Sequence, residues 1–167
     1  MKGRLPKTTR PTTGRAREAL FNLLQSRTDL VGAACLDLFS GTGAVAVQCA
    51  ERGANIVHAV EIHRLLARKI EEKLAKVPGA ESKVFATNAM DFILRPPARY
   101  DFVFADPPYA FVGKETLVAG CLGVLNPAGL MVLEHPFYEG FDGVPGFKET
   151  RRYGLGAFSF FFPPNSE

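Results

Sequence analysis

The chain has 167 residues, of which 47% are hydrophobic and 22% are charged, and its formal net charge is +3. This size and balance are typical of one soluble globular domain with a hydrophobic core, and no apolar run is long enough to cross a membrane. The first residues are not followed by a hydrophobic stretch, so we expect no signal peptide.

Positive charge gathers at the start of the chain. Before residue 18 the sequence has six lysine and arginine residues and no acidic residue. Because cations placed in this way can contact phosphates, we expect residues 1–11 to form a basic arm of a single domain spanning 1–167; the alternative is a solvated end without a partner. The residues that we expect to contact nucleic acid are Arg4, Lys7, Arg10, Thr12 and Arg15.

Hydrophobic periodicity divides the rest of the chain into alternating strands and helices. A helix is predicted from Thr13 to about Arg27, with Thr12 or Thr13 as its cap. The elements that follow are predicted in chain order as a strand at 33–39, a helix at 44–52, a strand at 55–60, a helix with a buried stripe at 66–77, a strand at 83–87, a helix at 89–94, a strand at 100–105, a helix at 114–125 and a strand at 130–134. This order predicts a parallel sheet with helices on both faces, and the segments 147–153 and 157–162 are predicted to pair antiparallel at its edge.

A glycine loop joins the first predicted strand to the helix after it. Gly41, Gly43 and Ala46 have the G-x-G-x-x-A spacing of nucleotide-binding loops, and the acidic Glu61 lies about 20 residues further on. Such a loop binds either a dinucleotide or S-adenosylmethionine. A dinucleotide brings an anionic pyrophosphate toward Asp37, whereas S-adenosylmethionine brings an ammonium and a sulfonium that Asp37 attracts. The loop therefore favours S-adenosylmethionine over NAD, and Glu61 suits the ribose of either ligand.

A second motif, Asp106-Pro107-Pro108-Tyr109, follows the apolar predicted strand 100–105. In an open parallel sheet, ligands bind beyond the carboxyl ends of the strands, so we expect this corner beside the glycine loop. The prolines make the corner rigid and leave the Asp106 carboxylate and the Pro107 carbonyl as acceptors. These acceptors can bond both N–H groups of an aromatic amine and aim its lone pair at a methyl donor, while Asp106 takes the proton and Tyr109 stacks on the base. The corner therefore predicts methylation of a base amine.

The cysteines and histidines give no sign of a metal site. The three cysteines lie in apolar segments, which is typical of buried free thiols in a cytoplasmic protein. No metal-ligand spacing joins the histidines, so we predict no metal. We expect His58 to pack in or beside its strand and His135 either to border the site or to lie at a sheet edge, and we expect the phenylalanines at 158 and 160–162 to belong to the sheet core.

Several segments together resemble one known family. They are residues 10–22 from Arg10-Pro11-Thr12-Thr13 to Leu20-Phe21-Asn22, residues 36–43, residues 106–109, Glu134-His135, Arg152-Tyr153-Gly154 and Phe158-Ser159-Phe160. Along nearly its whole length the chain is similar to the bacterial guanine-N2 methyltransferases of small-subunit (16S) ribosomal RNA. The Arg-Pro-Thr segment is the most family-specific of these marks, because the glycine loop and the Asp-Pro-Pro-Tyr corner occur in many amine methyltransferases.

The resemblance implies a Rossmann-like class I methyltransferase fold, with a mostly parallel seven-stranded sheet and an antiparallel pair of strands at its C-terminal end. It implies S-adenosylmethionine as cofactor, ribosomal RNA or a small-subunit assembly particle as partner, and a monomer. Under this resemblance the cofactor-binding residues are Asp37, Phe39, Ser40, Gly41, Thr42, Gly43, Glu61, Ile62, Asn88 and Ala89, and the catalytic residues are Asp106, Pro107, Pro108 and Tyr109.

The sequence departs from the family pattern in three places. Gly14 and Asn88 stand where the family usually has acids, and the segment before residue 10 is shorter than usual, which we expect to weaken RNA docking. An asparagine at 88 can still bond adenine, without the charge.

Alternative functions remain open on the sequence. The corner suits adenine N6 and cytosine N4 as well as guanine N2; an NAD-dependent oxidoreductase and a nucleic-acid-binding protein without catalysis are the other candidates. Guanine also presents an N1–H donor beside its amine, so a guanine site needs one more acceptor near Asp106, for which we expect a backbone carbonyl near Ala110 or Phe111.

Overall fold

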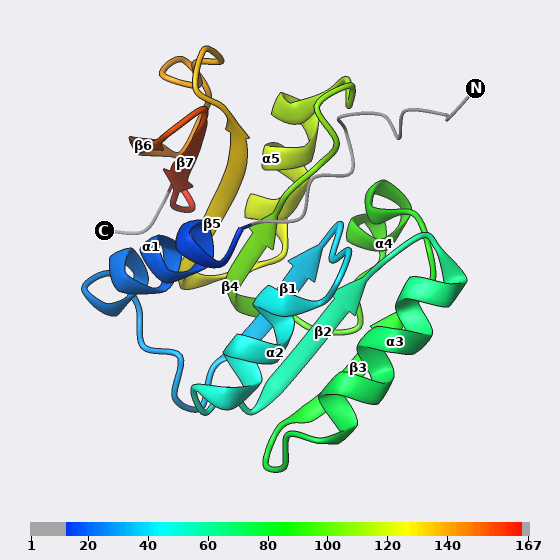
Figure 1. Cartoon of the computed structure of the whole chain (residues 1–167). Helices are drawn as coiled ribbons and strands as arrows, with labels where there is room; N and C mark the ends of the chain where they lie inside the picture. Colours follow the sequence, from blue (N-terminus) through cyan, green and yellow to red (C-terminus); the bar gives the residue numbers. More distant parts are fainter. Residues whose placement is uncertain (1–12, 165–167) are drawn as a thin grey trace.

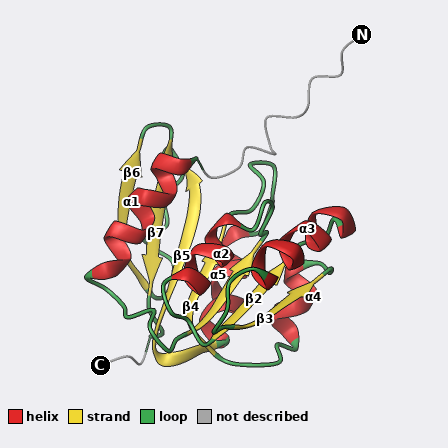
Figure 2. Ribbon diagram, turned by 60° about the horizontal axis from the view of Figure 1, so that its bottom comes forward, coloured by secondary structure: helices red, strands yellow, loops and turns green. Residues whose placement is uncertain are grey.

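In the computed structural model, which describes residues 13–164, seven strands form one sheet and five helices cover its faces (Figures 1 and 2). The strands are β1 (Ala34–Leu38), β2 (Ile56–Val60), β3 (Glu81–Phe85), β4 (Tyr100–Ala105), β5 (Leu125–Pro136), β6 (Phe147–Tyr153) and β7 (Gly156–Phe161). The helices are α1 (Gly14–Gln25), α2 (Ala44–Glu51), α3 (Arg64–Ala75), α4 (Ala89–Leu94) and α5 (Lys114–Gly123).

The strands lie in the order β3-β2-β1-β4-β5-β7-β6. The first five are parallel to one another, and β7 pairs antiparallel with both β5 and β6. This confirms the predicted mostly parallel sheet with an antiparallel C-terminal pair. The order reverses between β1 and β4, which places the carboxyl ends of these two strands on either side of a crevice, the usual ligand position in such sheets.

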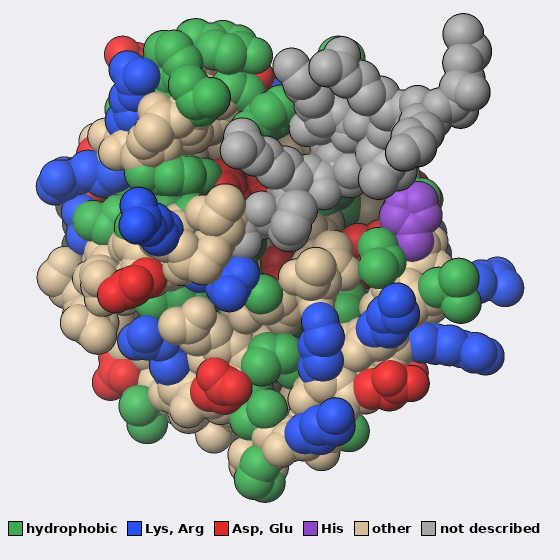
Figure 3. All heavy atoms as spheres, viewed as in Figure 1, with side chains coloured by type: hydrophobic (Ala, Val, Ile, Leu, Met, Phe, Trp, Pro, Cys, Tyr) green, Lys and Arg blue, Asp and Glu red, His purple; other side chains and the backbone are tan. Residues whose placement is uncertain are grey.

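Helices bury both faces of the sheet, which explains why its strands are almost continuously apolar. One face packs against α1, α2 and α3, and the other against α4 and α5. Phe158 and Phe160 belong to the first core and Phe161 to the second, while Phe162 is half-buried against the first. The phenylalanine run is therefore sheet core, as predicted. On the outer side α3 is charged, and its lysine and arginine side chains are visible at the lower right of Figure 3.

Three predicted boundaries were wrong. The third strand begins at Glu81 instead of Lys83, because it is an edge strand whose charged residues alternate with half-buried ones and obscure its start. The fifth helix ends at Gly123, and the strand after it runs from Leu125 to Pro136 instead of 130–134. The Asn-Pro-Ala-Gly segment predicts a turn before this strand; the strand instead accommodates it as an irregularity, where the register shifts between Tyr100 and Phe102 of β4.

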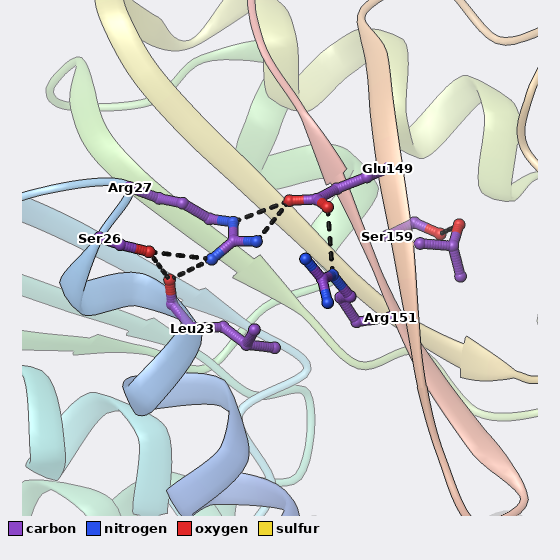
Figure 4. A network of polar contacts seen from close by, with 7 residues as sticks. Leu23, Ser26, Arg27, Glu149, Arg151 and Ser159 are labelled. Carbon is purple, nitrogen blue, oxygen red and sulfur yellow. Dashed lines mark hydrogen bonds and ion pairs between the residues drawn. The ribbon is translucent and has the colours of Figure 1, made fainter.

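Helix α1 is fastened at both ends. The side chain of Thr13 accepts a hydrogen bond of 3.2 Å from the backbone N–H of Ala16, which confirms Thr13 as the cap. Beyond its other end, Arg27 donates from Nε to Glu149 of β6 at 2.9 Å, and Arg151 reaches the second oxygen of that carboxylate at 3.1 Å (Figure 4). The hydrogen bonds from Arg27 hold the pKa of Glu149 below its usual value. The ion pair ties the first helix to the last antiparallel pair.

The buried histidines make hydrogen bonds inside the fold. His58 Nδ1 lies 2.8 Å from the hydroxyl of Tyr100, which confirms that His58 packs in its strand. His135 is only 2% exposed; its Nε2 lies 2.6 Å from the hydroxyl of Ser159 and its Nδ1 lies 2.8 Å from the carbonyl of Pro136. Burial lowers the pKa of both histidines. The three cysteines are buried and free, as predicted.

These histidines make the stability depend on pH. Each has a lower pKa in the folded protein than in the unfolded chain, so the unfolded chain binds protons that the folded one resists. Stability is therefore full above pH ~6.5, the ordinary pKa of histidine, and falls as the pH is lowered, with a slope of at most about 1.4 kcal/mol per pH unit for each histidine. Urea unfolding of His135→Gln between pH 5 and 8 should show a shallower slope than the unsubstituted protein. The exposed His63 provides the control, since His63→Gln should keep the slope; an equal slope in the His135 variant would contradict the assignment.

Candidate active site at the carboxyl ends of the strands

A cavity of about 390 Å³ opens where the strand order reverses. Most of the predicted cofactor residues line it, namely Asp37, Phe39, Ser40, Gly41, Thr42, Glu61, Ile62, Asn88 and Ala89. Asp106 and Pro108 from the predicted corner line it as well. The fold thus brings two motifs that lie far apart in the sequence to one cavity.

Asp37 lies at the bottom of the glycine loop. Its side chain is buried, and one oxygen accepts hydrogen bonds from the hydroxyl of Ser40 at 2.6 Å and from the backbone N–H of Ala46 at 3.1 Å. Burial raises the pKa of this carboxyl to about 7, against the opposing effect of these two hydrogen bonds, and the negative charge of Glu61 raises it further. Asp37 therefore changes its charge near neutral pH in the protein without a ligand.

The loop has an unusual backbone. Phe39 has a positive φ of 55°, unique among the non-glycine residues that the structure describes, and Gly41 and Gly43 have φ values of 60° and 78°. Positive φ values are strained for residues with a side chain, and such strain is common at ligand sites. Gly43 is also packed closely, since a Cβ there would lie 2.9 Å from Ile70. Gly43 does not line the cavity, so its part is to let the loop turn against α3.

Glu61 joins the loop to the end of β2. Its two carboxylate oxygens accept hydrogen bonds from the backbone N–H of Gly41 at 2.9 Å and from that of His63 at 2.8 Å. A carboxylate has about four acceptor positions, so Glu61 can hold the loop and still accept hydrogen bonds from a ligand in the cavity.

Asn88 caps helix α4. Its Oδ1 accepts hydrogen bonds from the backbone N–H groups of Met90 at 2.8 Å and Asp91 at 3.3 Å. With the oxygen used in this way, the Nδ2 group is the part of the side chain that can face a ligand, so Asn88 offers the cavity hydrogen-bond donors where an acid would offer an acceptor.

The Asp106-Pro107-Pro108-Tyr109 corner forms the wall nearest β4. The backbone N–H of Asp106 reaches the carbonyl of Leu38 on β1 at 3.5 Å, which joins the corner to the strand that carries Asp37. Pro107 is buried, and the carbonyl of Pro108 accepts a hydrogen bond of 2.8 Å from Phe111. Tyr109 is 44% exposed and does not line the cavity. Its ring is therefore available to a molecule approaching from outside.

Some lining residues were missed in the sequence, and some predicted residues lie elsewhere. Phe104, Leu66, His63 and Thr87 line the cavity without having been predicted. Phe104 has a readable signal, because it precedes Asp106 by two residues and so shares its side of the strand. Arg15 is exposed on α1, whereas Arg4, Lys7, Arg10 and Thr12 lie outside the described residues.

Two other types of site were searched for in residues 13–164. Within this range, no three histidine, cysteine, aspartate or glutamate side chains are grouped so that they could hold a metal ion. None of the helices in the same range is both long and apolar enough to cross a membrane.

Comparison with known proteins places this site in a family. Residues 2–162 match the family described as "Conserved hypothetical protein 95". The chain belongs to this family. Among its relatives, the ribosomal RNA small subunit methyltransferase D of Escherichia coli K12 is 36% identical over 129 residues, which cover 77% of this chain and 62% of the relative. The enzyme of the same name from Buchnera aphidicola (subsp. Baizongia pistaciae) is 32% identical over 71% of this chain and 58% of its own length. The matched part thus spans less than two thirds of these relatives.

Solved structures show the same fold. A Thermus thermophilus protein of undescribed function is 28% identical, with a TM-score of 0.79 over 95% of this chain and 91% of that one. The magnesium protoporphyrin IX methyltransferase of Synechocystis, solved with S-adenosylmethionine bound, is only 14% identical, yet it superposes with a TM-score of 0.68 over 87% of this chain and 77% of that one. The chain therefore has the Rossmann-like class I methyltransferase fold that its sequence predicted.

Gly43 provides a test of the loop geometry. Gly43→Ala would place a Cβ against Ile70 and force a side chain onto a φ of 78°. We expect urea unfolding to show a loss of about 1–3 kcal/mol. Gly140→Ala is the matched control, because no atom lies within 4 Å of its Cβ position and its φ is not positive. Equal stability of the two variants would refute the close packing of the loop on α3.

Proposed function

We propose that this protein is an S-adenosylmethionine-dependent methyltransferase that modifies the N2 amine of a guanine in small-subunit ribosomal RNA. The observation that carries this proposal is that Asp106 and Pro108 of the corner line the same cavity as Asp37 and Glu61. A cavity with a cofactor end and an amine-binding end is what methyl transfer to a base amine requires. The names of the relatives, ribosomal RNA small subunit methyltransferase D, support the choice of RNA.

The residues of the cavity fit S-adenosylmethionine. Asp37 supplies a carboxylate for the ammonium of its methionine part, Glu61 supplies acceptors for its ribose hydroxyls, and Asn88 supplies donors for ring nitrogens of its adenine. The apolar side chains of Phe39, Ile62 and Leu66 complete the walls. A dinucleotide fits less well, because its pyrophosphate would lie over the buried acid Asp37.

The corner orients the amine and receives its proton. An aromatic amine is a weak nucleophile, because its lone pair is delocalised into the ring. Asp106 and the Pro107 carbonyl accept hydrogen bonds from its two N–H groups and direct the lone pair into the cavity. S-adenosylmethionine, when bound, supplies an electrophilic methyl group. As the new N–C bond forms, the nitrogen gives up one proton, and Asp106 is the acceptor within reach of it. The rigid Pro107–Pro108 backbone keeps these acceptors in place.

The surroundings of the corner suit RNA. The exposed ring of Tyr109 can stack on a base that has left its helix or loop. Arg15 on α1, together with Arg4, Lys7, Arg10 and Thr12 at the basic start of the chain, is proposed to contact RNA. The partner is ribosomal RNA, free or in an assembly particle, in the cytoplasm. Guanine N2 is chosen over adenine N6 and cytosine N4 on the family relationship.

The product identifies the reaction. We expect incubation with small-subunit ribosomal RNA and labelled S-adenosylmethionine to yield N2-methylguanosine after digestion to nucleosides, measured by mass spectrometry. Asp106→Ala should lower the rate to less than a few per cent while leaving the affinity for S-adenosylhomocysteine nearly unchanged, because Asp106 faces the amine. N6-methyladenosine or N4-methylcytidine as the product would refute the guanine assignment, and an active Asp106→Ala variant would refute the role of Asp106.

Asp37 makes cofactor binding depend on pH. Only the ionised carboxylate attracts an ammonium, and burial raises the pKa of Asp37 to about 7 in the protein without ligand. The affinity for S-adenosylhomocysteine should therefore rise between pH 5.5 and 7.5, by up to about tenfold per pH unit below the pKa. Isothermal titration calorimetry measures this dependence. Asp37→Asn should bind more weakly at pH 7.5 and lose most of the pH dependence; unchanged binding would show that Asp37 does not contact the ammonium.

A further inference from the structure

Beyond the corner, the next strand of the sheet carries a second acid beside Asp106. Ala105 of β4 pairs with Leu133 of β5, so the residues that follow, Asp106 and Glu134, leave neighbouring strands side by side (Figure 1). Side chains alternate along a strand, and Phe104 and Val132 pack in the core beneath α1, α2 and α3. Asp106 and Glu134 each follow two positions later and so lie on this same side of the sheet, where Asp37 also lies.

A tyrosine from the antiparallel pair fixes the position of Glu134. The hydroxyl of Tyr153 donates a hydrogen bond to Oε1 of Glu134 across β7. The Tyr153 ring stacks on Phe158, with centroids 4.5 Å apart and an angle of 29° between the planes. Burial raises the pKa of Tyr153, and the charges of Glu134 and then of Asp106 and Tyr109 act in the same direction, as their proximity requires.

Glycine at 156 is needed for this arrangement. Gly156 lies opposite Tyr153 in the register, and a Cβ on it would lie only 2.6 Å from the Tyr153 oxygen. No residue with a side chain could stand there without displacing the hydroxyl from Glu134. The pair is thus built by three strands: Glu134 from β5, Tyr153 from β6 and the space left by Gly156 on β7.

The polar groups form a row in the order of the strands. Along the sheet edge stand Asn88 after β3, Glu61 after β2, Asp37 on β1, Asp106 after β4 and Glu134 on β5. Under the proposed function the first three hold the adenine, ribose and methionine parts of the cofactor, and the fourth holds the target amine. A base bonded by Asp106 therefore extends toward β5, away from the cofactor. Neighbouring strands are about 4.8 Å apart, a spacing at which two carboxylates can reach adjacent donors on one base edge.

We propose that Glu134 accepts the N1–H of the target guanine and that Tyr153 positions Glu134 for this contact. This inference rests on the proposed function and makes Glu134 the residue that selects guanine, in place of a carbonyl near Ala110 or Phe111. The chemistry is selective because adenine and cytosine have an acceptor at the corresponding ring nitrogen, which a carboxylate repels and leaves unpaired. A mismatch of this kind lowers kcat/KM by about tenfold or more.

A base analogue isolates the N1–H group. 2-Aminopurine keeps the 2-amino group of guanine but has an acceptor at N1. A synthetic RNA fragment spanning the mapped methylation site would carry either guanine or 2-aminopurine at the target position. We expect the unsubstituted protein to prefer guanine by at least about tenfold in kcat/KM. Glu134→Gln should bring this ratio close to one, because the glutamine amide can donate to the N1 of 2-aminopurine.

Two further variants separate selection from a purely structural role. Tyr153→Phe keeps the ring on Phe158 but removes the hydroxyl, and should lower the guanine preference without changing the affinity for S-adenosylhomocysteine. Glu139→Gln is the matched control, since Glu139 is paired with Lys114 at 2.8 Å away from the corner and should keep the full preference.

The results distinguish this inference from the proposed function. Equal loss of activity on both RNAs in Glu134→Gln, or an unsubstituted protein that methylates 2-aminopurine as readily as guanine, would overturn the role of Glu134 while N2-methylguanosine formation stands. If the unsubstituted protein forms no N2-methylguanosine, the proposed function is refuted and the inference with it.

Discussion

The buried carboxylate of Asp37 holds the glycine loop, and the site is arranged around this contact. Ser40 and Ala46 donate to one of its oxygens, and they belong to the loop and to the helix that follows it. Burying a carboxylate is unfavourable, which is why its pKa rises to about 7 despite these hydrogen bonds. A cation above the loop would relieve this cost. The loop is therefore prepared for a positively charged ligand before the ligand arrives.

Glu61 extends the same principle to the neighbouring strand. It joins Gly41 to His63 through backbone hydrogen bonds, so the ends of β1 and β2 are connected by a group that also faces the cavity. Holding such groups in position before binding lowers the entropy that a ligand must lose in ordering them. The backbone strain at Phe39 is maintained by these contacts together with the close packing of Gly43 on Ile70.

The antiparallel end of the sheet is joined to the site as firmly as the parallel part. Through Arg27 and Glu149 the helix α1 is tied to β6, and through Tyr153 and Glu134 β6 is tied to β5 beside the corner. His135 and Ser159 form a further hydrogen bond between β5 and β7. The C-terminal pair is consequently more than a cover for the sheet edge, because it sets the position of a carboxylate next to Asp106.

The sequence by itself determined the features that depend on neighbouring residues. The alternation of apolar segments predicted the strands and helices, and the glycine loop and the Asp106 corner were identified because their backbone requirements are local. It also determined the sheet class, because regular alternation of strands and helices permits few other arrangements. The start of β3 and the extent of β5 were wrong, because strand ends are set by pairing with a neighbour, and Ile56 and Tyr100 are far away in the chain.

Only the tertiary structure decided which distant residues share the site. Glu134 and Tyr153 stood among the segments that resemble the family, yet nothing in their spacing indicated that they pair. Their contact depends on the position of β7 between β5 and β6 and on the register that sets Gly156 opposite Tyr153. The sequence left His135 undecided between the site and a sheet edge, and its burial against Ser159 settles its place. Sheet order and register are fixed by long-range packing, which short-range sequence patterns do not contain.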